Sequence, residues 1–196
     1  MVTTKIYAPP ALHEKEIIRY TGANVSENRE LLSIIRESCI ELLPCLSYKV
    51  CYTEINLLSS DADVCVFDGF EVKSSSLVKN LRGCRRVILF AATVGLEIDR
   101  LINKYGSISP VKALVMQAIG AERIESLCDK FCADIEKEFN VATNPRFSPG
   151  YADLELSVQK EIFRHLECEK RIGLYLNNAY SLSPSKSVTA FIGIKE

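Results

Sequence analysis

The 196-residue sequence contains no tryptophan and only two histidines, His13 and His165. The histidines are far apart and have no companion ligands beside them, so a zinc site is not expected. The glycine-rich patterns that bind phosphate, GxGxxG and GxxxxGK followed by Ser or Thr, do not occur, and neither does the GxSxG motif of serine hydrolases. We therefore expect no metal site and no catalytic residue of these kinds.

An excess of charge of one sign is also missing, because 24 lysines and arginines face 25 aspartates and glutamates, for a net charge of -1. Such a chain has no basic field that would recruit nucleic acid or anionic lipid. Its longest apolar runs, such as residues 87–92, are far shorter than the ~20 residues of a membrane-spanning helix. The N-terminus leads into Pro9-Pro10 without the apolar stretch of a secretion signal. We expect a cytoplasmic protein with no nucleic-acid or membrane partner.

The eight cysteines include no CxxC pair, and the closest two, Cys128 and Cys132, stand in a CxxxC spacing. Thiols of a cytosolic chain normally stay reduced. Most of these cysteines lie among apolar neighbours, as Cys65 does in the run 64–67, where cysteine serves as a small core residue. We expect reduced core residues, and not disulfides, metal ligands or a redox site.

The chain has no internal repeat, low-complexity segment or long linker, which predicts a single domain over residues 1–196, with N-terminal helices in residues 1–45 packing on it. Apolar periodicity and capping signals predict helices at residues 12–20, 26–43, 74–83, 95–105, 110–139 and 157–166. β-branched and aromatic runs predict strands at residues 48–58, 64–67, 70–72, 85–92, 173–176 and 188–194.

Three local signals carry much of this assignment. Asp68-Gly69 is typical of a two-residue hairpin turn between two short strands. The run 85–92 is apolar and partly β-branched, which suits a central strand buried on both faces. Ser157 is placed to cap the last clear helix. Helices at both ends of a group of strands favour an α+β fold, with a mainly antiparallel, twisted sheet flanked by helices.

The segment 144–151 is the most unusual stretch of the chain. Two prolines flank Arg146, and Pro149-Gly150 forms a turn whose backbone can lie close to a ligand. The guanidinium of Arg146 can grip a carboxylate through two hydrogen bonds, and Tyr151 adds a flat apolar face with a hydroxyl. The segment therefore suits a small zwitterionic or aromatic ligand. The alternative is a rigid surface turn with an exposed arginine and a packing tyrosine.

Four pieces follow one another along the chain: Arg146-Phe-Ser-Pro-Gly-Tyr151, a helix at residues 159–166, Glu169-Lys170-Arg171-Ile172-Gly173, and Leu182-Ser-Pro-Ser-Lys-Ser-Val188. This combination resembles the S-adenosylmethionine-binding activation domain of cobalamin-dependent methionine synthase. That domain shows Arg-x-x-Pro-Gly-Tyr, a helix, Glu-Lys-x-x-Gly and Pro-x-x-Ser-Val in the same order. Upstream, residues 85–98 and 120–129 look like the short, free-standing members of the family. The resemblance implies the fold of that domain.

The resemblance also implies an S-adenosylmethionine site on the loop. Arg146 matches the arginine that holds the methionine carboxylate, and Ser148, Gly150 and Tyr151 match the positions that line the adenosyl part. Glu125 is the match for an acidic residue on the preceding helix that contacts the ligand. From its surroundings alone, Glu125 would be a solvated helix residue.

The chain departs from the family pattern in two places. Residues 152–155 read Ala-Asp-Leu-Glu where Pro-Ala-Cys-Pro is usual, and the family's N-terminal Asp-Trp-Thr-Pro-Phe-Phe stretch has no counterpart. The site implied by the resemblance is therefore partial.

By the same resemblance, the chain is expected to be an activation subunit of a split cobalamin-dependent methionine synthase, a methyltransferase. It would use S-adenosylmethionine in the reductive remethylation of cob(II)alamin. No Asp-x-His-x-x-Gly motif occurs, so cobalamin is expected on a corrinoid-binding partner subunit, with a flavodoxin-like or other reductant. Two alternatives remain: a docking subunit for a corrinoid protein that does not use S-adenosylmethionine, and a stand-alone methyltransferase. The missing glycine-rich loop disfavours the commonest form of the latter.

Overall fold

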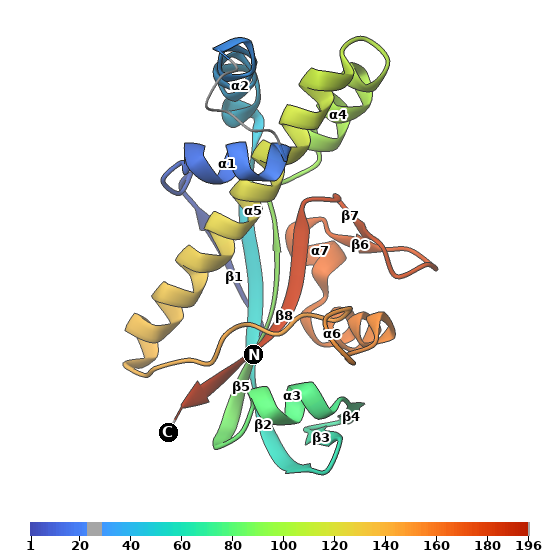
Figure 1. Ribbon diagram of the computed structural model, residues 1–196. Coiled ribbons are helices and arrows are strands. Elements are labelled where there is room, and N and C mark those ends of the chain that lie inside the picture. The colour runs from blue at the N-terminus through green and yellow to red at the C-terminus, as the bar shows by residue number, and fades with distance from the viewer. Residues whose placement is uncertain (23–28, 196) are drawn as a thin grey trace.

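The computed structural model describes residues 1–22 and 29–195, in which a twisted sheet is flanked by helices on both faces (Figure 1). Its strands are β1 (Thr3–Tyr7), β2 (Tyr48–Asp61), β3 (Val64–Phe67), β4 (Phe70–Lys73), β5 (Cys84–Thr93), β6 (Tyr175–Leu176), β7 (Leu182–Ser183) and β8 (Ser187–Lys195). The main sheet has the order β4-β3-β2-β5-β8, with β1 also beside β2, and β6 and β7 form a separate pair. Every pairing between the described strands is antiparallel. The predicted α+β class with a mainly antiparallel sheet is confirmed.

Strand β5 occupies the middle of the sheet, between β2 and β8. Because successive side chains of a strand point to opposite faces, β5 contributes to two different hydrophobic cores. Ile88, Phe90 and Ala92 lie in the core shared with α5, and Val87, Leu89 and Ala91 lie in the core shared with α6 and α7. The prediction of a strand buried on both faces is therefore confirmed for residues 87–92, whereas Arg85 is exposed.

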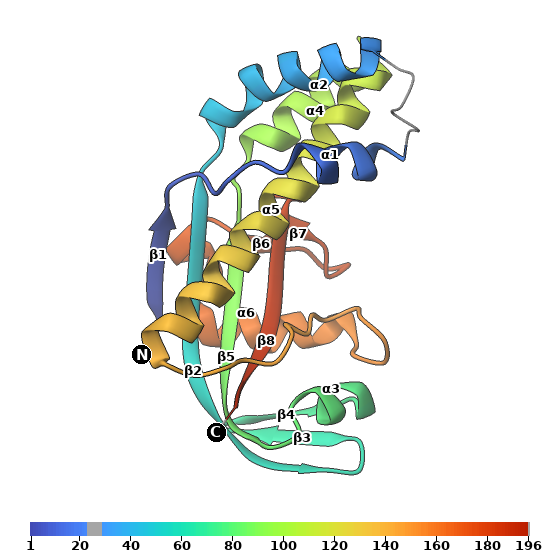
Figure 2. The ribbon, with the colours of Figure 1, turned by 60° about the vertical axis from the view of Figure 1, so that its left-hand side comes forward.

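The helices are α1 (Glu14–Thr21), α2 (Arg29–Leu42), α3 (Ser75–Asn80), α4 (Glu97–Gly106), α5 (Pro110–Phe139), α6 (Gln159–Leu166) and α7 (Cys168–Ile172), with short 3-10 turns η2 (Leu43–Cys45) and η3 (Leu156–Val158). Figure 2 shows α5 crossing one face of the sheet, with α1, α2 and α4 gathered at one end of the molecule. The opposite face carries α6 and α7, and α3 lies with the β3–β4 hairpin at the other end (Figure 1). None of the described helices is long and apolar enough to cross a membrane.

Helix α5 begins and ends at clear sequence signals. Ser109 caps its N-terminus by accepting a hydrogen bond from the Lys112 amide, and Pro110 takes the first helical position. Asn140 ends it in the left-handed conformation, with a φ of 51°. Gly120 does not interrupt the helix. A Cβ there would lie 2.9 Å from Cγ of Lys186 and 3.0 Å from Cδ1 of Ile98, so glycine permits this close approach.

Several expectations from the sequence need correction. Strand β1 was not expected, because its stability comes from pairing with β2, where Thr3 lies opposite Tyr52, and not from a local pattern. Ser157 does not cap α6: it lies in η3, its hydroxyl donates to Glu155, and the capping position belongs to Val158. The predicted strand 173–176 is shorter, because Gly173 ends α7 in the left-handed conformation. The predicted start of the second helix, near residue 26, lies outside the described residues.

A buried ion pair joins α5 to the N-terminal segment. Glu122 and Arg123 are 2% and 1% exposed, and Nε of Arg123 lies 2.5 Å from Oε2 of Glu122. Arg123 also donates to the carbonyls of Pro10 at 2.8 Å and Ala11 at 2.7 Å. Glu122 in turn accepts a hydrogen bond from the His13 amide at 3.1 Å. The backbone of residues 10–13 is thereby fixed against the helix.

Replacing Glu122 with alanine should therefore destabilise the fold strongly. Glu122→Ala leaves the Arg123 guanidinium buried without its counter-charge, which costs about 3–5 kcal/mol in the free energy of unfolding. Urea denaturation monitored by circular dichroism measures this loss. Glu161→Ala is the matched control, because Glu161 pairs with Arg164 on the surface of α6 and should contribute less than about 1 kcal/mol. Equal losses in the two variants would contradict a structural role for the buried pair.

Candidate ligand-binding site

The loop that contains Arg146 runs along the edge of strand β8. The Asn144 amide donates to the Gly193 carbonyl at 2.8 Å, and Phe147 and Phe191 exchange two backbone hydrogen bonds of 2.9 Å. Phe147 is buried in the core shared with α6 and α7. Because neighbouring side chains of an extended segment point to opposite faces, Arg146 is directed to the other face, toward α5.

Arg146 meets two carboxylates of α5. Its Nη1 donates to Oδ1 of Asp129 at 2.5 Å, and its Nη2 donates to Glu125. Glu125 and Asp129 are four residues apart, so they lie on the same face of the helix, one turn from each other. The Arg146 side chain is 24% exposed, compared with 42% for Glu125 and 70% for Asp129. Burial opposes the charged form of Arg146, but the hydrogen bond with Asp129 raises its pKa above the ordinary value, and the guanidinium stays charged.

The turn after Arg146 exposes one aromatic side chain. Gly150 adopts a φ of +89°, which favours glycine, and a Cβ there would lie 2.8 Å from Cδ2 of the exposed Leu156, whose side chain would have to move. The Ser148 carbonyl accepts a hydrogen bond from the Tyr151 amide at 3.1 Å. The Tyr151 ring packs edge-on against Phe147 with centroids 5.3 Å apart, and it remains 67% exposed. Its outer face is available for contact with a ligand.

Asp153 attaches this turn to helix α3. Its carboxylate accepts hydrogen bonds from the hydroxyls of Ser74 at 2.6 Å and Ser75 at 2.7 Å, and from the Ser75 amide at 2.8 Å. Ser74 is also the N-cap of α3, where its side chain accepts a hydrogen bond from the Leu77 amide. The hydrogen bonds from Ser74 and Ser75 hold the pKa of Asp153 well below its usual range. Asp153, which stands in the stretch that departs from the pattern described above, thus fastens the turn to α3.

Two hollows lie between α5 and the N-terminal segment and meet at shared residues. A hollow of about 450 Å³ is lined by Tyr7, Ala8, Pro9, Pro10, Ala11, His13, Ser126, Asp129 and Lys130. A hollow of about 230 Å³ is lined by His13, Glu16, Arg19, Tyr20, Glu122, Glu125, Ser126 and Asp129. Small-molecule sites in proteins typically have volumes of roughly 300–1,000 Å³, so the two together offer room for such a ligand.

A groove of about 640 Å³ lies on the other side of Arg146. It is lined by Cys132, Glu136, Thr143, Asn144, Pro145, Arg146 and Lys195. Its edge is fixed by Glu136, whose carboxylate accepts hydrogen bonds from the amide and hydroxyl of Thr143 at 3.0 and 2.8 Å. Arg146 thus lines this groove while it contacts Glu125 and Asp129, which line the hollows beside α1.

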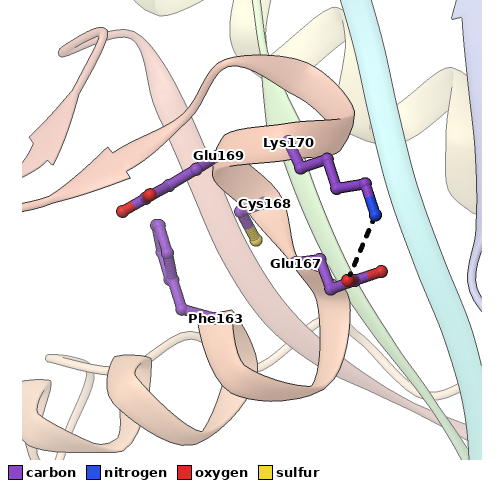
Figure 3. A pocket seen from close by; sticks show the side chains of 5 residues that line it. All are labelled: Phe163, Glu167, Cys168, Glu169 and Lys170. Carbon is purple, nitrogen blue, oxygen red and sulfur yellow. Dashed lines mark ion pairs between the residues drawn. The ribbon is translucent and has the colours of Figure 1, made fainter.

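A separate hollow of about 240 Å³ lies between α6 and α7, where Phe163 and Glu169 stand on one side and Lys170 points toward Glu167 (Figure 3). The Lys170–Glu167 pair is loose, at 3.7 Å, and largely exposed. Cys168 is buried there, and its hydrogen bond with Cys51 together with burial raises the pKa of its thiol well above the ordinary value. A thiol that stays protonated is a poor nucleophile, so Cys168 is not prepared for nucleophilic chemistry.

The remaining cysteines and histidines do not form a site. All eight cysteines are free, and six are buried, as expected for core residues. Burial raises the pKa of the Cys128 thiol above its usual value. Within residues 1–22 and 29–195, no group of three or more metal-ligating side chains comes together.

The structure brings together some of the residues selected from the sequence and adds others. Arg146 and Glu125 are in contact, while Ser148, Gly150 and Tyr151 form the turn that follows. Asp129 was not selected, although its four-residue spacing from Glu125 was a usable signal. Glu122 and Arg123 were also missed, because charged residues are exposed by default.

The sequence matches no protein-family model and no curated protein. Among solved structures, the chain is similar to the crystal structure of the MetH reactivation domain bound to AdoHcy, with a TM-score of 0.71. The similarity covers 98% of this chain and 78% of that chain, at 14% sequence identity. The chain has the fold of the MetH reactivation domain. This confirms the predicted fold, and at so low an identity the reactivation-domain likeness concerns the fold alone.

The contact between Asp153 and α3 predicts a pH-dependent stability of this reactivation-domain fold. A carboxylate with a lowered pKa stabilises the folded state above its unfolded-state value of about 3.9, and this contribution is lost as the pH falls through the folded-state value. Asp153→Asn should therefore be less stable than the parent by a constant amount from neutral pH down to about pH 4, and this gap should narrow progressively at lower pH.

Urea midpoints measured from pH 7 to about pH 2 follow this gap through the range in which it should narrow. Asp61→Asn is the control, because it removes an exposed carboxylate at the end of β2 and should move the midpoint little. A constant gap across the pH range would contradict the assignment of the effect to the charge of Asp153.

Proposed function

We propose that this chain binds S-adenosylmethionine and serves as the activation subunit of a split cobalamin-dependent methionine synthase. The observation that carries the proposal is the contact of Arg146 with Glu125 and Asp129, beside two hollows, in a chain with the fold of a domain that binds AdoHcy. AdoHcy is the thioether that remains when S-adenosylmethionine gives up its methyl group.

The groups around Arg146 suit the amino-acid end of this ligand. Arg146 donates to the ligand carboxylate, which takes the place of one of the carboxylates that the guanidinium now contacts. Glu125 is then free to accept hydrogen bonds from the α-ammonium group. A guanidinium beside carboxylates thus offers partners of both signs to a zwitterion, without any catalytic acid or base.

The apolar surroundings suit the adenosyl end. Tyr151, with its exposed ring, and the backbone at Ser148 and Gly150 lie on the same loop as Arg146, and we propose that they contact the adenosyl part from there. Glycine lets a ligand approach the main chain closely. Pro9 and Pro10 line the larger hollow with rigid apolar rings. A purine ring gains from such flat apolar surfaces.

In this proposal the reacting cofactor belongs to the partner. A corrinoid-binding subunit would hold the cobalamin, which would supply the methyl-accepting cobalt, and a flavodoxin-like or other electron donor would supply the reducing electron. This chain contributes alignment: it holds the sulfonium at a fixed place and direction, which is the main requirement of a methyl transfer. The site lies at the surface, as docking of a partner requires.

A second function rests on one observation. Arg146 already has carboxylate partners within the chain, so its charge is satisfied without a ligand. A subunit that docks to a corrinoid protein without using S-adenosylmethionine would need no more than this. Ligand binding separates the two functions.

Calorimetric titration with S-adenosylmethionine tests the proposal. The parent should bind in the micromolar range, and Arg146→Ala should weaken binding at least about tenfold, the loss expected for a charge-assisted hydrogen bond. Arg164→Ala is the matched control, because it removes an exposed arginine of α6 that pairs with Glu161 and the Gly69 carbonyl. Thermal melts of the variants show that each is folded. If the parent shows no binding at millimolar ligand, the proposal fails and the docking function is favoured.

A further inference from the structure

The charges around Arg146 do not balance. Two carboxylates, those of Glu125 and Asp129, face one guanidinium, which leaves one net negative charge at this point of the surface. The neighbouring charges are already paired: Glu16 with Arg19 at 2.6 Å, and Glu122 with Arg123 at 2.5 Å. The excess therefore belongs to the two acids of α5.

Of the two acids, Asp129 is the one whose negative charge can attract a ligand in either hollow. It lines both hollows beside the N-terminal segment, whereas Glu125 lines only the smaller one. Its side chain is 70% exposed, and Arg146 occupies one of its two oxygens, Oδ1. Its other oxygen, Oδ2, is left for a cation that enters the hollows.

We propose that Asp129 is a specificity residue that favours a sulfonium ligand over the corresponding thioether. This inference rests on the proposed binding of S-adenosylmethionine. That ligand carries one positive charge more than AdoHcy, at the sulfur that links its amino-acid and adenosyl ends. With the amino-acid end at Arg146 and the adenosyl end along the proline-lined hollow, the sulfur lies between them, beside Asp129.

The attraction acts on the reactive form of the ligand and not on its product. The sulfonium is drawn to the carboxylate, and the neutral thioether gains nothing from it, so the product leaves more readily once the methyl group has gone. A partly exposed pair contributes modestly and is screened by salt. Selectivity, and not total affinity, is therefore the quantity that reports on Asp129.

The test compares both ligands on four proteins. Dissociation constants of S-adenosylmethionine and AdoHcy are measured by calorimetry for the parent, Asp129→Asn, Asp129→Glu and Glu71→Gln. The parent should prefer the sulfonium, Asp129→Asn should reduce the preference by about two- to fivefold, and Asp129→Glu, which keeps the charge, should retain most of it. Added salt should narrow the preference of the parent. Glu71→Gln removes an equal charge from β4, at the far end of the molecule, and should leave the ratio unchanged (Figure 1).

The outcomes separate this inference from the proposed function. If the parent and Asp129→Asn bind both ligands with the same ratio, the inference is overturned while the proposed function stands. The inference is overturned in the same way if the parent binds AdoHcy as tightly as S-adenosylmethionine. If the parent binds neither ligand, both proposals fall.

Discussion

The buried pair of Glu122 and Arg123 is the interaction on which the shape of the candidate site depends. Neighbouring residues of a helix do not normally face each other, yet here both side chains turn to the same stretch of N-terminal backbone. Through the carbonyls of Pro10 and Ala11, and the amide of His13, they hold this segment beside α5. Without that attachment, the larger hollow would lose the wall that residues 7–11 and His13 provide, and the smaller hollow would lose the contribution of His13.

Helix α5 contacts two separate segments, the N-terminal segment and the Arg146 loop, along the same stretch of its length. One side carries the N-terminal segment at Glu122 and Ser126, and the other carries the Arg146 loop at Glu125. Asp129 stands where the two sides meet. A single rigid helix therefore sets the distance between the apolar and the charged parts of the site, which is how a scaffold preorganises a ligand-binding surface.

Much of the fold could be predicted from local signals. The hairpin at Asp68-Gly69, the buried run of β5 and the proline start of α5 each depend on a few neighbouring residues, and each was found. Strand β1 could not be found in this way, because its partner Tyr52 is about fifty residues away in the chain. The same holds for the buried charges of Arg123, since a charged residue in a helix gives no local sign of the backbone that it will contact.

The candidate site likewise contains residues that local sequence signals reveal and residues that they do not. Arg146 stands out because prolines and glycine surround it, and Glu125 was selected, as a ligand contact, from the resemblance to a known family. The ion pair between the two residues was not predicted. Asp129 and Asp153 take their places only through contacts between distant segments: one with the loop, the other with the serines before α3.

The backbone hydrogen bonds between residues 142–147 and β8 also affect how the protein behaves at high concentration. An open sheet edge presents unpaired amides and carbonyls that invite another chain to add as a strand. Here β8 is paired with β5 on one side and with the loop on the other, and Pro145 has no amide hydrogen to donate to an incoming strand. The loop proposed to bind the ligand thus also protects this edge of the sheet against self-association.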